Sequence, residues 1–460
     1  MRSNRSATIP PWHHSRGRFP FLIRLLLAIL LGTLAQPARS QPAGQAEKSL
    51  EARVARILAE VPLIDGHNDL PENYRERVGD HLAKIDIAKD TSALEHPLST
   101  DIPRLRRGGV GGQFWSVYVS TQLKGADPVV AVFEQIDLVH RMVARYPETF
   151  ALATTAAEAE RIHAAGKIAS LIGMEGGHSI DNSLGVLREA YACGARYMTL
   201  THWNNTDWAD AATDKPVHGG LTAFGREVVR EMNRMGMLVD LSHVSDATML
   251  AAIETSEAPV ICSHSSARAL TNHVRNVPDD ILKRVAANGG IVMVNFAPGF
   301  VSEEVRIADA PIEAEWTRLG ALYPNDSKRV EAELKAFRAA HPVPQATLAQ
   351  VADHIEHIRA VAGVDHVGLG SDFDGISSTP VGLEDVSKYP ALLVELLRRD
   401  WSDDDVKKVA GLNILRVMRQ VERVAERLQK QRPPSDARIE DLDAPPVPAD
   451  HGGPAGGSSK

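Results

Sequence analysis

Cysteine is scarce in this chain, which has only Cys193 and Cys262 among its 460 residues. A disulfide framework is therefore excluded as the source of stability, and the fold must depend on a hydrophobic core. Both cysteines lie in apolar runs, so we expect two free thiols rather than one bridge across a long loop. Cys262 precedes His264 by two residues, and we interpret it as a packing residue rather than a metal ligand.

The chain also lacks an excess of basic residues. Its 51 Lys and Arg residues are outnumbered by 59 Asp and Glu residues, which gives a net charge of -8. Outside the N-terminal region the basic residues are scattered, so nucleic acid is not an expected partner. With 43% hydrophobic residues, the length suits one large globular domain or two ordinary ones.

Long apolar runs are absent except near the N-terminus, where LLLAILLGTLA at 25–35 follows five arginines and precedes Ala38-Arg39-Ser40. This run is short for a membrane span but typical of a signal peptide. We therefore expect residues 1–40 to be a signal peptide and the mature protein to be periplasmic or secreted, without stable membrane insertion. An uncleaved anchor is the alternative. Residues 41–60 would form a lead-in, and residues 431–460, rich in Pro, Gly, Ser and Asp, a disordered tail.

What the chain does contain is a regular alternation of apolar runs and amphipathic helical segments. Most runs are continuously apolar, as expected for parallel strands that are covered on both faces. The eight runs begin at Leu63, Gly111, Ile168, Ala195, Met237, Pro259, Gly290 and His366. We predict a (β/α)8 barrel of the TIM type over residues 61–430. A nucleotide-binding doubly wound sheet is disfavoured, because no G-x-G-x-x-G turn follows an early strand.

The longest departure from this alternation is the segment at about 297–344. It contains the charged helical stretch SKRVEAELKAFRAAH, which begins at residue 327. We interpret the segment as an excursion over the site rather than as a separate domain, because long insertions in compact domains are often functional.

Chemically suitable side chains follow most of the predicted strands. In a barrel, such positions meet at the C-terminal mouth, the face on which active sites are built. Any one of them could instead be a core histidine, a cap or a turn residue, so the repeated placement carries the argument. These side chains are His67, Asp69, Glu175, His178, His202, His243, His264, Asp372 and Asp374.

Several histidines with carboxylates and no adjacent cysteine suit zinc or a similar divalent ion. Two metals that share a carboxylate would use all of these ligands and could activate water. Glu175 is the natural bridge, because the glycines of MEGG allow a close backbone approach. A role beside a helix N-cap is the alternative for Glu175.

Five motifs follow one another in this sequence: DGHNDLP, the segment from MEGGHSIDN to THWNNTDWAD, VDLSHVS, ICSHSSARALTNHVRNVPDD and GLGSDFDG. These motifs resemble the membrane dipeptidase family, also called renal dipeptidase. They occur in the family's order between about residues 61 and 417. The resemblance implies the barrel, a zinc-dependent dipeptidase activity, two zinc ions per chain and a tendency to form homodimers.

The resemblance also assigns roles to residues of this sequence. It implies that His67 and Asp69 bind the first zinc, that His243 and His264 bind the second, and that Glu175 bridges both. His202 would face the substrate and stabilise the oxyanion. Arg275 would hold the substrate's C-terminal carboxylate, for which a guanidinium is well suited, although a salt bridge at the start of a helix is the alternative. Asp372 would move the proton from water to the leaving amine.

These roles predict hydrolysis of a short peptide, with a dipeptide as substrate and a C-terminal D-residue tolerated as in some relatives. Phe300 stands where mammalian relatives have a tyrosine, which removes a hydroxyl near the substrate. The cysteine pairs and C-terminal anchoring signal of mammalian members are also missing.

Two alternatives remain. One is another barrel hydrolase, such as a lactonase, a β-lactamase-like enzyme or an N-acyl amino acid hydrolase. Such relatives often begin with His-x-His, whereas this chain has His-Asn-Asp. The other is a non-catalytic peptide-binding descendant, which the complete set of ligands disfavours.

Overall fold

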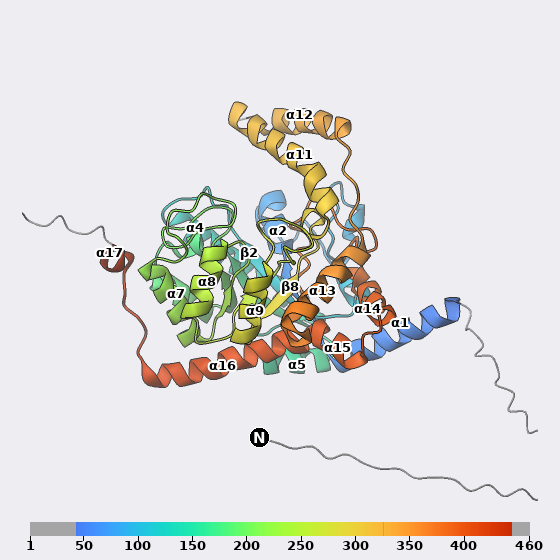
Figure 1. Cartoon of the computed structure of the whole chain (residues 1–460), viewed down its shortest axis with the longest axis horizontal. Coiled ribbons are helices and arrows are strands. Elements are labelled where there is room, and N and C mark those ends of the chain that lie inside the picture. The colour runs from blue at the N-terminus through green and yellow to red at the C-terminus, as the bar shows by residue number, and fades with distance from the viewer. Residues whose placement is uncertain (1–42, 325, 444–460) are drawn as a thin grey trace, which may run out of the picture.

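The computed structural model of the protein describes residues 43–324 and 326–443. The predicted signal peptide therefore lies outside the described residues. A closed barrel of eight parallel strands forms the centre of the molecule, and helices surround it (Figure 1). Its strands are β1 (Leu63–Asn68), β2 (Val110–Tyr118), β4 (Ile168–Glu175), β5 (Ala195–Thr199), β6 (Leu238–Asp240), β7 (Ile261–Cys262), β8 (Ile291–Val294) and β9 (Val367–Leu369). The predicted barrel and its eight strands are confirmed.

Barrel closure follows from the pairing of the strands. Each strand pairs in parallel with the next around the ring, in the order β1, β2, β4, β5, β6, β7, β8 and β9, and β9 returns to β1. The sequence analysis missed the short strand β3 (Phe150–Leu152), which pairs only with β4 and lies outside the ring. Three residues are too few to show a periodic pattern.

The helices follow the strands as the alternation predicted. The long ones are α1 (Ala43–Glu60), α2 (Leu70–Val78), α4 (Asp127–Arg145), α5 (Ala156–Ala164), α6 (Leu184–Ala192), α7 (Ala223–Met235), α8 (Asp246–Thr255), α9 (Asp279–Asn288), α11 (Glu303–Leu322), α12 (Ser327–Ala340), α13 (Leu348–Ala362), α14 (Tyr389–Arg398) and α16 (Asn413–Gln431). Shorter helices are α3 (Ile102–Arg107), α10 (Pro298–Val301), α15 (Asp403–Lys407), α17 (Ile439–Leu442) and the π-helical turn η5 (Lys408–Leu412). Single 3-10 turns are η1 (Thr91–Ala93), η2 (Gly177–Ile180), η3 (Val364–His366) and η4 (Val386–Lys388).

The hydrophobic core has two layers because the strands bury both faces. The larger layer lies between the barrel and the helices and includes Leu63, Trp115 and Cys262. The inner layer fills the barrel and includes Ile64, Phe114 and Tyr197 from the strands. Apolar residues of α16 belong to this inner layer, and α16 runs across the lower end of the barrel (Figure 1). The lower end is thus closed by α16.

Both cysteines are free, as expected from the sequence. Cys262 is fully buried in the outer layer, and burial raises the pKa of its thiol. Its role as a packing residue is therefore consistent with the structure. Cys193 lies at the C-terminal end of α6 and is partly buried.

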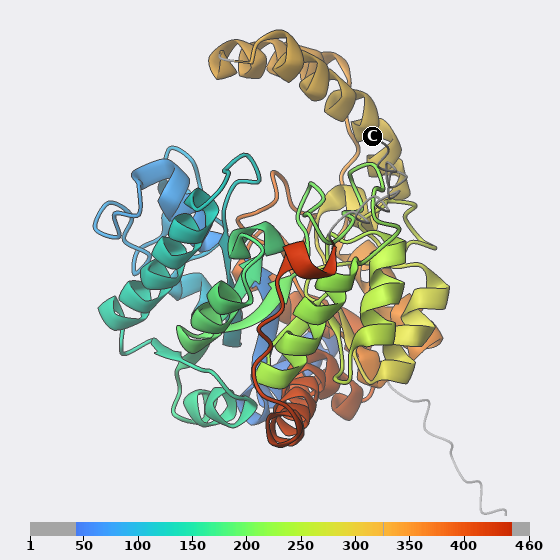
Figure 2. The same cartoon turned by 90° about the vertical axis from the view of Figure 1, so that its left-hand side faces the viewer.

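The predicted excursion forms an arm made of α11 and α12, which projects away from the barrel in both views (Figures 1 and 2). A small cluster of its own, centred on Ile312, Leu319 and Leu334, joins the two helices. Only Phe300 of α10 belongs to the lining of the cavity at the barrel mouth. The segment thus lines the cavity through α10, and no residue of α11 or α12 lines it.

The prediction of a disordered tail from residue 431 is wrong for residues 432–443. This segment runs past α6, whose Arg188 guanidinium donates to the Ser435 carbonyl at 2.9 Å. The Asp443 carboxylate accepts from the Thr222 hydroxyl at 2.6 Å, and α17 lies beside α7 in Figure 2. Polar composition suggested disorder, but specific hydrogen bonds hold this segment. Residues 444–460 lie outside the described residues.

Candidate metal and catalytic site

The predicted site residues meet at the C-terminal mouth of the barrel. His67 lies near the end of β1, Asp69 directly after that strand, and Glu175 at the last position of β4. The other residues are His202 after β5, His243 after β6, His264 after β7 and Asp372 after β9. All are buried except Asp372, which is partly exposed. Positions far apart in the sequence therefore converge because parallel strands end on the same side.

Glu175 lies at the centre of this cluster, and its two oxygens face different neighbours. Its Oε2 lies 3.4 Å from His67 Nε2. Its Oε1 lies 3.0 Å from His243 Nε2, 3.4 Å from His264 Nε2 and 3.6 Å from His202 Nε2. One carboxylate thus separates two groups of possible ligands, as a bridging position requires.

Three groups of side chains could each hold a metal ion. They are His67 with Glu175 and His264, Glu175 with His202 and His243, and His67 with Asp69 and Asp372. The first two share Glu175, which is the arrangement of a binuclear site. They differ from the predicted grouping, because His264 joins His67, with ring centroids 3.8 Å apart, and Asp69 joins Asp372. His202, expected to face the substrate, lies close enough to join the second group.

Two histidines are oriented by hydroxyl groups behind them. The Tyr197 hydroxyl lies 2.8 Å from His67 Nδ1 and can donate to the Gly66 carbonyl at 3.3 Å. The Ser263 hydroxyl donates to Asp240 Oδ2 at 2.6 Å and lies 2.7 Å from His264 Nδ1. A hydroxyl that donates its proton elsewhere accepts one from the ring, so each Nδ1 carries the hydrogen. Nε2 of both rings then carries a lone pair and is directed at the cluster, where His264 Nε2 lies 3.0 Å from His243 Nε2.

The backbone is strained where the strands deliver these groups. His243 has φ of 72° and Asp372 has φ of 67°, in the left-handed region that most side chains avoid. Such conformations cost about 1–3 kcal/mol each and persist where the surroundings impose them. The MEGG glycines are required as well, because a Cβ at Gly177 would lie 2.5 Å from the Leu200 carbonyl oxygen. Two residues of the site, His243 and Asp372, thus lie at left-handed backbone positions.

Several buried polar atoms of the cluster lack a hydrogen-bond partner within the described residues. They are His67 Nε2, Asp69 Oδ1, His202 Nδ1 and His243 Nδ1. A buried polar group without a partner is costly, and such groups are rare in folded proteins. The unpartnered His67 Nε2 and Asp69 Oδ1 fit divalent cations.

Burial and neighbouring charges shift the pKa values of the carboxylates here. Burial raises the pKa of Asp372 to about 8, with the charge of Asp69 adding to the effect. Burial likewise raises the pKa of Glu72 to about 9, again with Asp69 contributing. Any cation bound among these groups lowers both pKa values, because it stabilises the ionised forms. The electrostatics of the mouth therefore also favour positive ligands.

Arg275 is the one guanidinium at the cavity, and it is 1% exposed. Its Nη1 makes only a long contact of 3.5 Å with the Ser265 hydroxyl, and its Nε has no partner. Burial lowers the pKa of Arg275 to about 10, so the group stays charged at neutral pH. No carboxylate of the described residues lies within ion-pair distance of it, so the predicted alternative of a salt bridge is not found. A buried, unpaired cation is suited to an anionic ligand.

These residues surround a cavity of about 160 Å³, which suits a small ligand. Its lining comprises Asp69, Glu72, Tyr118, Glu175, His202, Trp203, His243, Arg275, Phe300, Asp372 and Gly375. Glycine is needed at position 375 because the backbone there lies close to Asp69, and a Cβ would lie 2.2 Å from Asp69 Oδ2. Sequence reasoning missed Glu72, Tyr118 and Trp203. Glu72 follows Asp69 by three residues, so a helix beginning at Leu70 could have indicated that it turns toward the site.

Two other strand-end residues do not join the cluster. His178 Nε2 lies 3.0 Å from the Val119 carbonyl oxygen, and Asp374 Oδ1 accepts from the Ser99 amide at 2.7 Å. Neither belongs to the three groups above. Asp374 fulfils the turn role that SDFDG also allowed, whereas Asp372 faces the cavity.

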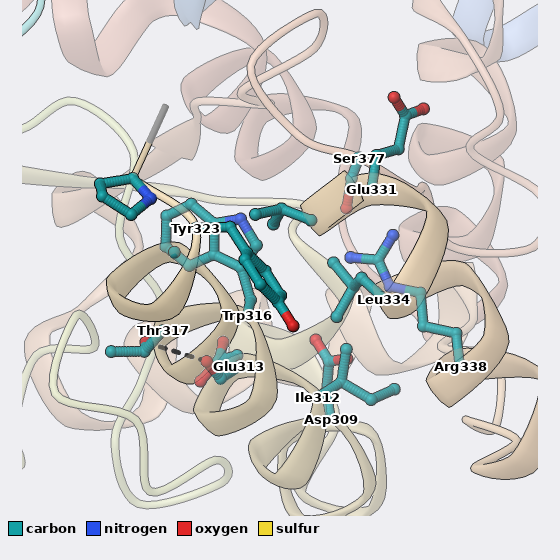
Figure 3. A pocket seen from close by; sticks show the side chains of 13 residues that line it. Asp309, Ile312, Glu313, Trp316, Thr317, Tyr323, Glu331, Leu334, Arg338 and Ser377 are labelled. Carbon is teal, nitrogen blue, oxygen red and sulfur yellow. Dashed lines mark hydrogen bonds between the residues drawn. The ribbon is translucent and has the colours of Figure 1, made fainter. Parts of the chain in front are cut away.

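A larger cavity of about 900 Å³ lies along the arm (Figure 3). Trp316, Tyr323 and Leu334 contribute apolar surface, and the Thr317 hydroxyl donates to the Glu313 carbonyl at 3.0 Å. None of its lining residues belongs to the three candidate metal groups. The chemistry of the molecule is therefore assigned to the smaller cavity.

Comparison with known sequences assigns the family. A sequence profile of the membrane dipeptidase family, peptidase family M19, matches residues 51–432. The chain belongs to this family. Dipeptidase 3 of Homo sapiens is 41% identical over 389 residues, which cover 84% of this chain and 70% of the human protein. Dipeptidase verJ of Clonostachys rogersoniana is 41% identical over 390 residues, which cover 82% and 89% of the two chains. The enzyme is thus a metallo-dipeptidase, a hydrolase of peptide bonds.

Solved structures share the fold at lower identity. The probable dipeptidase PvdM from Pseudomonas aeruginosa has a TM-score of 0.70 and 23% identity, and the match covers 82% of this chain and all of that one. A metallo peptidase from Rhodobacter sphaeroides, liganded with a phosphinate mimic of the dipeptide L-Ala-D-Ala, has a TM-score of 0.63 and 24% identity. That match covers 78% of this chain and 99% of the other. These likenesses support the barrel architecture.

Proposed function

We propose that this dipeptidase uses two zinc ions, which His67, Asp69, Glu175, His243 and His264 hold at the barrel mouth. The observation that carries the proposal is the placement of Glu175, whose Oε2 faces His67 and whose Oε1 faces His243 and His264. Imidazole and carboxylate donors without a thiolate suit zinc. Two such ions supply, when bound, the Lewis acidity that activates water and polarises a carbonyl.

Two other polar side chains transfer the proton of the attacking water and stabilise the negative charge that develops on the carbonyl oxygen. Asp372 Oδ2 accepts from the Asn295 side chain at 2.8 Å, which holds the carboxylate at the cavity wall. From there Asp372 takes the proton of the attacking water and passes it to the leaving amine. His202 donates an N–H to the oxyanion that forms at the scissile carbonyl. Its ring is held against Tyr118, with centroids 4.4 Å apart.

Arg275 selects substrates with a free C-terminal carboxylate. The guanidinium lies 5.5 Å from the centre of the Phe300 ring, and both side chains line the cavity. A bidentate carboxylate would satisfy donors that no protein group satisfies. A small cavity with one fixed anion site limits the substrate to dipeptides. The lack of a hydroxyl at Phe300 leaves an apolar wall beside the C-terminal residue, and we extend the proposal to C-terminal D-residues.

A dipeptide and its C-terminal amide test this proposal together. The wild-type enzyme is expected to hydrolyse L-Ala-D-Ala and L-Ala-L-Ala and to discriminate against the amides by at least about tenfold, because a charge-assisted pair is lost. Arg275→Met should reduce turnover of the free acids and abolish this discrimination. Arg318→Met is the matched control, because Arg318 pairs with Glu315 on the arm and does not line the cavity. Equal discrimination in wild type and Arg275→Met would contradict the role of Arg275, and no turnover of any dipeptide would favour another barrel hydrolase.

We also propose that the mature enzyme is exported, because of the apolar run at 25–35 and the small residues after it. In the described part of the chain, no helix has the length and apolar character needed to cross a membrane. Mass spectrometry of the N-terminus after expression in a host that exports proteins tests the cleavage near Ser40. A homodimer is a further part of the proposal, and sedimentation of the purified enzyme measures it.

A further inference from the structure

One wall of the catalytic cavity carries a carboxylate that the chemistry above does not use. Glu72 lies in the first turn of α2 and lines the cavity beside Tyr118 and Trp203. Within the described residues, Glu72 takes part in no ion pair. The cations of α2 are engaged elsewhere, since Arg75 pairs with Asp80 and Glu134, and Arg77 donates to the His96 carbonyl. Glu72 is thus a carboxyl group at the cavity without a positive partner, and the cations of the proposed centre would lower its raised pKa and favour its ionised form.

Local structure does not account for Glu72. A glutamate in a first helical turn can cap the helix by accepting from the N-cap amide. Here the Asp69 amide already donates to the Phe373 carbonyl at 3.0 Å, so Glu72 has no such role. The next residue fixes its position, because the Asn73 side chain donates to the carbonyls of Asp69 and Asp374. The first turn of α2 is therefore held rigidly, with Glu72 directed at the cavity.

The charges around the cavity are arranged asymmetrically. Glu72 follows β1, whereas Arg275 follows β7, and β9 and β8 stand between these strands in the ring. Asp69 and Glu175 are matched by the two cations of the proposed centre, but Glu72 is not among their ligands. A bound dipeptide that places its C-terminal carboxylate at Arg275 therefore directs its N-terminal residue toward Glu72.

We propose that Glu72 is a specificity residue that binds the cationic side chain of an N-terminal lysine or arginine of the substrate. The inference rests on the proposed function, because Arg275 sets the direction in which the dipeptide lies. The substrate's α-ammonium is one carbon from the scissile carbonyl and stays near Asp372. The longer side chain of lysine or arginine extends further, to the partly exposed edge where Glu72 lies.

The aromatic neighbours suit the same ligand. Tyr118 and Trp203 line the cavity with Glu72, and Trp203 is 46% exposed. Aromatic rings pack against the methylene groups of lysine and arginine and attract their cationic heads. A carboxylate flanked by two rings is thus a suitable receptor for a long cationic side chain. A neutral aliphatic side chain of the same length gains only the packing.

The test compares L-Lys-L-Ala with L-norleucyl-L-Ala, which has the same carbon chain without the ammonium group. For the wild-type enzyme we expect kcat/KM to be about tenfold higher for the lysyl substrate, since a charge-assisted contact is gained. Glu72→Gln should reduce this ratio to about one, mainly by lowering kcat/KM for the lysyl substrate. Glu76→Gln is the matched control: Glu76 is one turn further along α2 and exposed, and does not line the cavity. In Glu76→Gln, the ratio of kcat/KM for the lysyl substrate to that for the norleucyl substrate should stay within about twofold of the wild-type ratio.

The outcomes separate this inference from the proposed function. Hydrolysis of both substrates at equal rates by the wild-type enzyme would overturn the role of Glu72 and leave the dipeptidase proposal intact. An equal loss on both substrates in Glu72→Gln would also overturn it, because a group that holds the α-ammonium or the fold affects every dipeptide. Failure of the wild-type enzyme to hydrolyse either substrate would instead contradict the proposed function.

Discussion

The hydroxyl groups of Tyr197 and Ser263 decide which nitrogen of a neighbouring histidine is free. Each lies behind one ring and has another acceptor for its own proton, so it receives the Nδ1 hydrogen of His67 or His264. Both Nε2 atoms then face the cluster. The sequence indicated the histidines through their positions after strands, but not these hydroxyls. Tyr197 occurs within an apolar run, where a core tyrosine is the ordinary expectation.

Removing the Tyr197 hydroxyl should weaken metal binding without removing a ligand. Tyr197→Phe keeps the buried ring but leaves the His67 Nδ1 hydrogen without an acceptor. Loss of such a support typically lowers metal affinity by about 10- to 100-fold. Competition with a zinc chelator measures the affinity directly. Tyr191→Phe is the control, because the Tyr191 ring stacks with Arg196 away from the site. A zinc affinity of Tyr197→Phe equal to that of the wild-type enzyme would contradict the account.

At the scale of elements, most of the arm packs in a cluster distinct from the two layers of the barrel, which α11 joins at its start through Val305. The α11–α12 pair has its own small cluster, whereas the barrel strands and their covering helices share the two large layers. The sequence predicted the barrel because eight apolar runs and the helices between them follow one repeating pattern. It could not predict the course of the arm. The periodicity of its charged helices does not show which other element they pack against.

This separation predicts that damage to the arm's cluster stays local. Leu319 is fully buried between α11 and α12, so Leu319→Ala should destabilise the arm by about 2–4 kcal/mol. Leu322→Ala, three residues along the same helix, is the control, because Leu322 is 54% exposed. Limited proteolysis should cut the arm faster in Leu319→Ala only, while dipeptide hydrolysis remains. A parallel fall in the melting temperature of the whole barrel would show that the arm and barrel unfold as one unit.

At the scale of the whole molecule, the strand order explains why the catalytic residues could be predicted. Every ligand candidate follows a different strand except His67 and Asp69, and a parallel barrel brings all strand ends to one mouth. Once the barrel is recognised, a residue that follows a strand in the sequence can be placed at the mouth of the barrel. Side chains that reach the cavity from helices and loops, such as Glu72 and Trp203, carry no such signal. Their placement depends on where a helix begins and how a loop turns.

Zinc content measured together with dipeptide hydrolysis tests the central claim that Glu175 joins two metal sites. The purified wild-type enzyme should bind about two zinc ions per chain, lose activity on chelation and recover it when zinc is restored. Glu175→Gln should bind less zinc and lose turnover by about a thousandfold, which corresponds to several kcal/mol. Glu227→Gln, an exchange at a solvent-facing pair with Arg230, should behave as wild type. Full activity of Glu175→Gln, or of the chelated wild-type enzyme, would contradict the account.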